Sequence, residues 1–194
     1  MSELTQALNR IMKWLSENQS SFAASFLPGL TYEQIETAVK HLHGKLPEEI
    51  YELYRWRNGT EARHDCVIYP AMNFISLEKA VKLYEDIATL DDTELEIRFA
   101  GYKLFPFIGH DAEISNVLLK DKPEKTSPVI YFADEDCEPE IVYSSLTNMM
   151  LTIAECYETG AYYLAEDGFA EQNEVKATEI FRKYNPDILE IDDY

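Results

Sequence analysis

The sequence predicts a single α+β domain in which helices pack around a central antiparallel or mixed β-sheet. Apolar residues recur at helical spacing in residues 1–90 and again after residue 144. Between these parts, residues 103–143 contain short runs rich in Val, Ile, Phe and Tyr that are separated by turn residues, as is typical of strands. The length of 194 residues suits one domain, and an apolar content of 46% is sufficient for a core.

The first two helices are indicated by periodicity and by a capping motif. Residues 4–15 carry apolar side chains on one helical face. Thr31 and Gln34 have the spacing of a capping box, in which the two side chains satisfy free backbone N–H groups at a helix start. We expect the second helix to end at Gly44, because glycine suits the C-terminal cap.

A third and a fourth helix are expected before the sheet. Pro47 suits the first position of a helix, and Asn58-Gly59 suits its exit, because both of those residues tolerate the left-handed conformation. Short β-type runs follow at 66–69 and 73–75. Residues 76–90 then form a helix that Ser76 caps.

The remaining elements are four strands and two helices. The strands are joined by hairpin loops at 121–128 and 134–139, which predicts antiparallel pairing, and they cover residues 103–108, 115–120, 128–133 and 140–143. A helix begins after Ser145 and ends at Gly160, and a last helix covers residues 173–184.

The charge of the chain is strongly negative. Thirty-six Asp and Glu against 17 Lys and Arg leave a net charge of −19, which disfavours nucleic acid and anionic membranes as partners. More than half of the acidic residues fall in four segments without Lys or Arg: 85–96, 134–140, 165–174 and 187–194. Solubility alone can account for this surface, and so can recruitment of a basic protein, which we expect here.

Acidic residues with neighbouring tyrosines form the predicted contact surface for such a basic partner. Carboxylates steer a basic surface, and tyrosine rings anchor it. The predicted partner-binding residues are Asp134, Glu135, Asp136, Glu138, Glu140, Tyr131, Tyr143, Asp91, Asp92, Glu94 and Glu96.

The sequence predicts neither an enzyme nor a cofactor or metal site. His41 and His43 are two positions apart on a helix and point to different faces. The acidic run 134–140 lacks the glycine and the distal glutamate of an EF-hand loop, which favours an acidic hairpin tip. His110 and Asp111 close a strand without a nucleophile, so an enzyme that uses them is the weaker alternative.

The cysteines and the N-terminus indicate the cytoplasm. Cys66, Cys137 and Cys156 are odd in number and far apart, which predicts free thiols in a reducing compartment. Residues 1–15 contain charged residues among their apolar positions and do not form a signal peptide, and no apolar run is long enough to span a membrane.

Three segments of the chain form a distinctive series: the run Leu46-Pro47-Glu48-Glu49-Ile50-Tyr51-Glu52-Leu53-Tyr54-Arg55-Trp56-Arg57-Asn58-Gly59, the strand Leu104-Phe105-Pro106-Phe107-Ile108-Gly109, and Val129-Ile130-Tyr131-Phe132 followed by Ser144-Ser145-Leu146. In this order they resemble the SUKH superfamily, which groups bacterial immunity proteins with fungal regulators of cell-wall assembly. The resemblance covers residues 31–160, so residues 1–30 are expected to be an N-terminal helical extension and residues 161–194 an acidic C-terminal extension with one helix.

The resemblance implies a non-catalytic protein-binding module. Its immunity branch implies neutralisation of a toxin domain, often a nuclease with a basic cleft, and this agrees with the acidic charge of the chain. Its fungal branch implies a different function, a regulatory scaffold of cell-wall or envelope assembly. The resemblance transfers no catalytic residues and no small-molecule substrate to this sequence.

Overall fold

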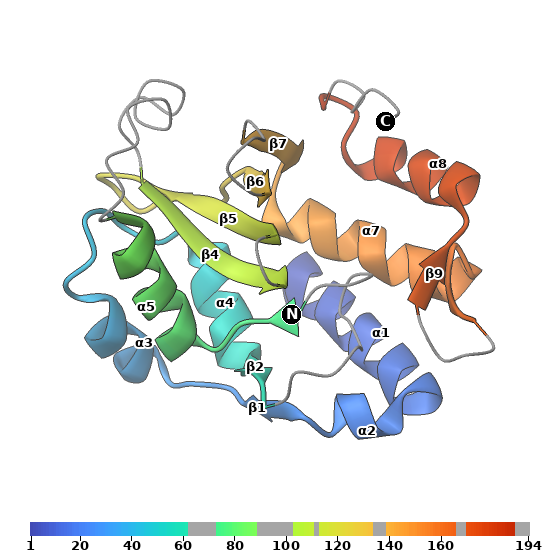
Figure 1. Cartoon of the computed structure of the whole chain (residues 1–194), viewed down its shortest axis with the longest axis horizontal. Helices are drawn as coiled ribbons and strands as arrows, with labels where there is room; N and C mark the ends of the chain where they lie inside the picture. Colours follow the sequence, from blue (N-terminus) through green and yellow to red (C-terminus); the bar gives the residue numbers. More distant parts are fainter. Residues whose placement is uncertain (62–72, 89–102, 111–112, 134–138, 166–169, 189–194) are drawn as a thin grey trace.

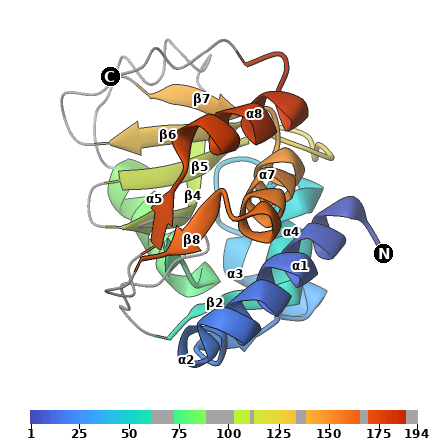
Figure 2. The ribbon, with the colours of Figure 1, turned by 90° about the vertical axis from the view of Figure 1, so that its right-hand side faces the viewer.

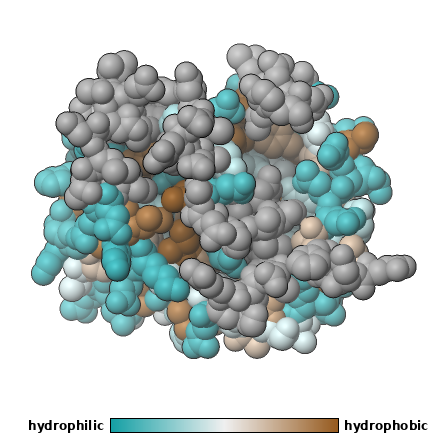
Figure 3. All heavy atoms as spheres, in the orientation of Figure 1, coloured by the Kyte–Doolittle hydropathy of each residue, from teal (hydrophilic) through white to brown (hydrophobic). Residues whose placement is uncertain are grey.

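The structure is a computed structural model, and it describes residues 1–61, 73–88, 103–110, 113–133, 139–165 and 170–188 (Figure 1). The predicted strand at 66–69 and the tip of the predicted hairpin loop at 134–138 lie outside these residues. Hydrophilic residues cover most of the described part of the face in Figure 3, and apolar side chains gather left of its centre.

A five-stranded antiparallel sheet forms the centre of the fold. Strand β5 (Glu113–Leu119) lies between β4 (Lys103–His110) and β6 (Val129–Ala133), and the order is completed on the two sides by β3 (Asn73–Phe74) and β7 (Glu140–Tyr143). Every neighbouring pair in this sheet is antiparallel. The predicted α+β fold and the antiparallel form of the sheet are therefore confirmed.

Helices cover the sheet. Figure 2 shows α1 (Glu3–Asn18), α4 (Glu48–Trp56) and α7 (Leu146–Thr159) on one side of it. Helix α5 (Leu77–Ala88) packs along β4, and α8 (Glu174–Tyr184) packs on α7. Ser145 caps α7, and Gly160 ends it in the left-handed conformation, both as predicted. No helix in the described ranges is both long and apolar enough to cross a membrane.

One hydrophobic core joins the terminal helices to the sheet. The buried face of α1 consists of Leu4, Ala7, Leu8, Ile11 and Leu15. These side chains belong to the same cluster as Phe105 and Phe107 of β4 and Ile180 of α8. The core therefore does not divide near residue 30 or residue 160, and both helical extensions share it with the central part of the chain.

The second helix is shorter than predicted. The capping box of Thr31 and Gln34 is present, but α3 spans Tyr32–Val39 and ends before Gly44. Two turn hydrogen bonds, Leu42 N–H to Val39 O and Gly44 N–H to Leu42 O, replace helical ones. The chain turns here because residue 45 bonds to the sheet, where Lys45 N–H donates to Lys120 O at 2.7 Å.

The third helix also differs from the prediction at both of its ends. Pro47 is the N-cap of α4 and not its first helical residue, and the helix ends at Trp56. The next residues form β2 (Arg57–Thr60), which pairs with β1 (Phe26–Pro28). Asn58-Gly59 therefore lies in a strand, where the Asn58 side chain accepts the Leu77 N–H at 2.9 Å and so caps α5.

The sequence analysis did not predict the short peripheral elements. These are the four-residue helix α2 (Ser20–Ala23), the β1–β2 pair, and the pair of β8 (Tyr162–Leu164) with β9 (Ala170–Gln172). Each strand of these pairs has three or four residues, which is too few for a clear period-two pattern.

Gly59→Ala is expected to destabilise the protein by about 2 kcal/mol. Gly59 has a φ of 81°, and an added Cβ would lie 2.5 Å from the backbone nitrogen of Ser76. Gly160→Ala is the matched control, since Gly160 has a φ of 70° but no neighbouring atom within 4 Å of the added carbon. Urea unfolding of both variants measures the difference, and an equal loss in both would show that the close approach to Ser76 has no cost.

Candidate protein-binding groove

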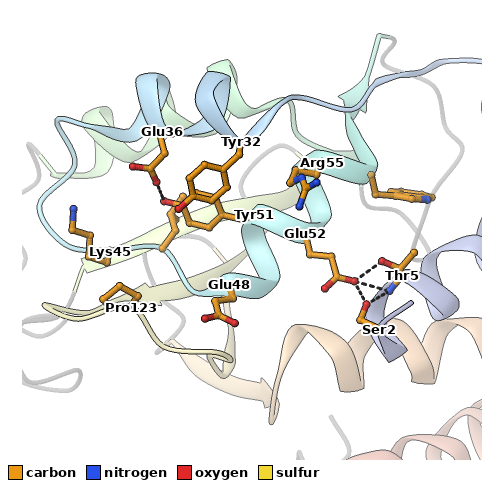
Figure 4. A pocket seen from close by; sticks show the side chains of 12 residues that line it. Ser2, Thr5, Tyr32, Glu36, Lys45, Glu48, Tyr51, Glu52, Arg55 and Pro123 are labelled. Carbon is orange, nitrogen blue, oxygen red and sulfur yellow. Dashed lines mark hydrogen bonds between the residues drawn. The ribbon is translucent and has the colours of Figure 1, made fainter.

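An open groove of about 900 Å³ lies beside α4, between α3, the start of α1 and the loop that joins β5 to β6 (Figure 4). The β5–β6 loop contributes Pro123, and Lys45 and Leu46 contribute from the segment before α4. The other lining residues come from the three helices and the N-cap of α1: Ser2, Thr5, Tyr32, Glu36, Glu48, Tyr51, Glu52, Arg55 and Trp56.

Helix α4 has two different faces. The face toward the core is buried and consists of Glu49, Ile50, Leu53 and Tyr54. The face toward the groove carries Glu48, Tyr51, Glu52 and Arg55. These positions follow the i, i+3, i+4, i+7 spacing that places residues on one side of a helix. The core therefore fixes α4 through one face and leaves the other face open.

Two stacked tyrosines form the middle of the groove. The rings of Tyr32 and Tyr51 are 5.1 Å apart between centroids and 22° apart in plane, and the Tyr32 side chain is 58% exposed. The Tyr51 hydroxyl donates a hydrogen bond to the Glu36 carboxylate. Burial, together with this bond, raises the pKa of Tyr51 above its ordinary value, so the ring stays neutral. The pair offers a flat, uncharged platform to solvent.

Glu52 ties the start of α1 to α4. Its carboxylate accepts hydrogen bonds from the Ser2 hydroxyl, the Thr5 hydroxyl and the Thr5 N–H, the last at 2.9 Å (Figure 4). Carboxylates are favourable at a helix N-terminus, because the free N–H groups there carry partial positive charge. The Glu52 carboxylate is therefore engaged within the protein.

Two cations in the groove have no such partner. The side chains of Lys45 and Arg55 make no hydrogen bond or ion pair within the part of the chain that the structure describes. In Figure 4 they lie on opposite sides of the Tyr32–Tyr51 pair. The groove thus presents a neutral aromatic platform between two cations, and the carboxylates of Glu36, Glu48 and Glu52 also line it.

The buried carboxylate of Glu49 holds α4 in place from behind. It accepts from the Thr147 N–H at 2.8 Å, from the Thr147 hydroxyl, and from the Ser127 N–H at 3.3 Å. Burial raises the pKa of Glu49, although these hydrogen bonds lower it in part. Glu49 therefore joins α4 to the first turn of α7 and to the end of the β5–β6 loop.

The β5–β6 loop supplies acceptors to the first N–H groups of α4. Glu48 N–H donates to Glu124 O at 2.9 Å, and Glu49 N–H donates to Lys125 O at 3.3 Å. These bonds satisfy donors that a helix start leaves free. They also fix the position of Pro123 beside the groove.

The structure describes three of the predicted partner-binding residues. Tyr131 and Glu140 face each other across β6 and β7, with Tyr131 half-buried and Glu140 exposed. Tyr143 is only 6% exposed and packs against Phe181, which gives it a place in the core and not on a contact surface. Eight predicted residues lie outside the described ranges: Asp134, Glu135, Asp136, Glu138, Asp91, Asp92, Glu94 and Glu96.

The residues considered for chemistry do not assemble within the described ranges. His41 and His43 are both exposed, and His41 Nε2 lies 3.0 Å from a carboxylate oxygen of Glu85. No group of three possible metal ligands occurs in the described part of the chain. Asp111 and the side chain of His110 are outside it, as are Cys66 and Cys137. Cys156 is a buried free thiol, and burial raises its pKa to about 12.

The sequence analysis missed the groove. It located this helix from Pro47 and Asn58-Gly59 and assigned no binding role to its side chains. The available signal was the second stripe of the same helix, where Tyr51, Glu52 and Arg55 follow helical spacing. Tyr32 is 19 positions from its stacking partner, and only the packing of α3 beside α4 brings the two rings together.

The comparisons with known proteins identify a family. The model of the SMI1 / KNR4 family (SUKH-1) matches residues 29–152. The matched range contains α3, α4 and the central sheet, and every lining residue of the groove except Ser2 and Thr5. No curated protein matches the chain closely enough to be named as a relative. Because the match covers well over half of its residues, the chain belongs to the SMI1 / KNR4 family (SUKH-1).

Proposed function

We propose that this chain is a non-catalytic protein-binding module of the immunity type, which neutralises a basic toxin domain in the cytoplasm. Membership of the SUKH-1 family supports a role of the immunity type or one related to the cell wall. The net charge of −19 favours a basic partner among the possible proteins.

The observation that carries the proposal is the open groove beside α4. Tyrosine, tryptophan and arginine are the residues that most often dominate the binding energy of protein interfaces. The groove contains all three types, in Tyr32, Tyr51, Trp56 and Arg55. The exposed Tyr32 ring is already held by stacking on Tyr51, so little side-chain entropy is lost when a partner covers it.

In this proposal the acidic charge acts on the rate at which the partner associates. Long-range attraction raises the association rate of oppositely charged proteins and falls with ionic strength, whereas close contacts determine mainly the dissociation rate. We expect the acidic segments, including the predicted contact residues around Glu140, to steer a basic toxin domain. The groove then makes close contacts.

The test uses toxin domains encoded beside the gene. Each is co-expressed with this chain in a sensitive host, and binding of the purified pair is measured by calorimetry at low and high salt. We expect growth rescue, affinity that falls with salt, and at least about tenfold weaker binding, ~1.4 kcal/mol, for Tyr32→Ala. Val175→Ala, a change at an exposed apolar side chain of α8, is the control. Absence of rescue by the wild-type chain with every neighbouring toxin would contradict the immunity role.

The same family membership also fits a regulatory scaffold of cell-wall or envelope assembly. An open groove admits segments from more than one protein, which suits a scaffold. Affinity purification from the native cells separates the two functions. A single basic effector supports the immunity role, and several assembly proteins support the scaffold.

A further inference from the structure

We propose that Asn58 is a site of spontaneous deamidation, that the fold keeps its side chain in the amide form, and that deamidation of the unfolded chain prevents its return to the native state. The reactive pair is Asn58-Gly59, the one Asn-Gly step in the sequence. The inference goes beyond the proposed function and does not rest on it, because it concerns the chemistry of the chain itself and needs no partner.

The reaction is an attack of the backbone on the asparagine side chain. The Gly59 nitrogen bonds to Cγ of Asn58, the bond from Cγ to Nδ2 breaks, and the Gly59 amide proton leaves with that nitrogen as ammonia. Glycine at the second position leaves the attack unhindered, because it has no side chain. Water then opens the cyclic imide. Opening beside Cγ gives aspartate, and opening beside the main-chain carbonyl gives isoaspartate, in which the backbone runs through the former side chain.

The first argument is that the fold requires both members of this labile pair. Gly59 is buried with a φ of 81°, and an added Cβ would lie 2.5 Å from the Ser76 nitrogen, so a bulkier residue that would slow the attack does not fit. The Asn58 Oδ1 atom accepts the Leu77 N–H at 2.9 Å. Leu77 is the first residue of α5, so its N–H has no acceptor inside the helix. Packing therefore places an acceptor side chain directly before an obligatory glycine.

The second argument is that the native contacts of the pair oppose ring closure. Closure requires the Asn58 side chain and backbone to turn until Cγ reaches the Gly59 nitrogen. The bond to Leu77 N–H holds the side chain toward α5. The pairing of β2 with β1, and the contact of Gly59 with the Ser76 backbone, restrict the main chain at the same step. The reaction therefore needs a local or global opening of this region first.

The third argument is that the two products affect the fold differently. Aspartate keeps an oxygen where Asn58 has its acceptor, and a carboxylate is favourable at the start of a helix. Isoaspartate adds a carbon to the backbone before Gly59 and so shifts that residue against Ser76, where the native spacing leaves no room. It also moves the acceptor away from Leu77. Isoaspartate at this position therefore prevents refolding, whereas aspartate does not.

The test compares ageing of the full chain in its folded and unfolded states. The protein is kept at mildly alkaline pH, either in buffer or in guanidinium chloride, and the tryptic peptide 58–63 is analysed by mass spectrometry. A sample taken at zero time corrects for deamidation during digestion. We expect the unfolded chain to lose the Asn58 amide steadily, and the folded chain to lose it at least about tenfold more slowly, since the reactive geometry is reached only by opening.

Refolding after ageing measures the consequence. On removal of denaturant, the fraction of aged chains that regains the native circular dichroism signal should fall in step with the isoaspartate fraction at position 58. Asn58→Ser is the control, because its hydroxyl can accept the Leu77 N–H but forms no imide, and it should keep its refolding yield. Asn58→Thr, whose branched side chain suits a strand, serves if the serine variant is unstable. Asn58→Asp should fold with an unfolding midpoint close to that of the wild-type chain.

Three results would overturn the inference. Equal rates of amide loss in the folded and unfolded chains would show that the fold gives no protection, and an intact Asn58 after ageing in denaturant would show that the pair is not labile. Equal refolding yields of the aged wild-type chain and aged Asn58→Ser would show that isoaspartate at this position is tolerated. None of these measurements involves a partner, so the proposed function stands or falls separately.

Discussion

Glu49→Ala is expected to lower the free energy of unfolding by about 3 kcal/mol. The Glu49 side chain is 5% exposed, and its carboxylate is the acceptor for the Thr147 N–H, the Thr147 hydroxyl and the Ser127 N–H. Alanine leaves these buried donors without an acceptor and leaves a space where the carboxylate was. The unsatisfied donors and the empty space both lower the free energy of unfolding. Removal of the carboxylate offsets part of this effect, because desolvating a buried carboxylate is itself unfavourable.

Glu48→Ala is the matched control for this prediction. Glu48 is the preceding residue on the same helix, but its side chain is exposed and makes no hydrogen bond within the described part of the chain. We expect a change within about 0.5 kcal/mol, as is usual for surface substitutions. Urea unfolding of both variants measures the difference. Equal stabilities of Glu49→Ala and Glu48→Ala would show that the buried hydrogen bonds contribute nothing net.

The pH dependence of the same site has a definite sign. Burial raises the pKa of Glu49 in the folded protein above its unfolded value of about 4.3, so the folded state holds this proton more tightly. Relative to Glu49→Gln, which does not titrate, the wild-type chain should be most stable below the unfolded pKa. That advantage should fall as the pH rises through the folded pKa. The measured quantity is the free energy of unfolding of the wild-type chain minus that of Glu49→Gln. A rise in this quantity between about pH 4 and pH 7 would contradict the prediction.

Leu8→Ala is expected to destabilise the whole protein by about 3 kcal/mol, although residue 8 precedes the family match. The Leu8 side chain is fully buried where α1 packs on α7. A cavity there affects the main core, which also contains buried residues of the sheet. One cooperative transition shifted to lower urea is therefore the expected result. Loss of α1 alone, with the rest of the core still folded, would show instead that α1 is an independent extension.

The exposed contacts of α1 are expected to matter less than its buried face. Arg10 forms two hydrogen bonds with Glu158 of α7, at 2.9 and 2.6 Å, but both side chains are partly exposed. Such ion pairs contribute up to about 1 kcal/mol. Lys13→Ala, at an exposed position of the same helix, is the control for Leu8→Ala and should change stability by about 0.5 kcal/mol or less.

The sequence predicted the elements whose signals are local. Thr31 with Gln34, Ser145 and Gly160 mark helix ends through bonds or backbone angles within a few residues, and the structure has all of them. The strands of the sheet are rich enough in Val, Ile, Phe and Tyr to be located before their partners are known, and β4 to β7 follow one another as hairpins. Local patterns are sufficient here because the interactions that stabilise these elements are themselves close in sequence.

Asn58-Gly59 and Glu49 show where local patterns were insufficient. The pair looked like a helix exit, but Asn58 caps α5 and Gly59 approaches the backbone of Ser76, 17 positions away. The local pattern around Glu49 gives no sign that its carboxylate is buried against Thr147, 98 positions away. Both roles depend on the packing of distant segments.

The acidic charge can be read from the sequence, whereas the groove is visible only in the tertiary structure. The net charge, the fold class and the family likeness follow from the amino-acid sequence alone, and together they predict a protein-binding module with a basic partner. The tertiary structure was needed to place Tyr32 on Tyr51, to engage Glu36 and Glu52, and to show that Lys45 and Arg55 have no partner among the described residues. Net charge is a sum that composition fixes, whereas the arrangement of charged and aromatic side chains on the surface depends on how the fold brings distant segments together.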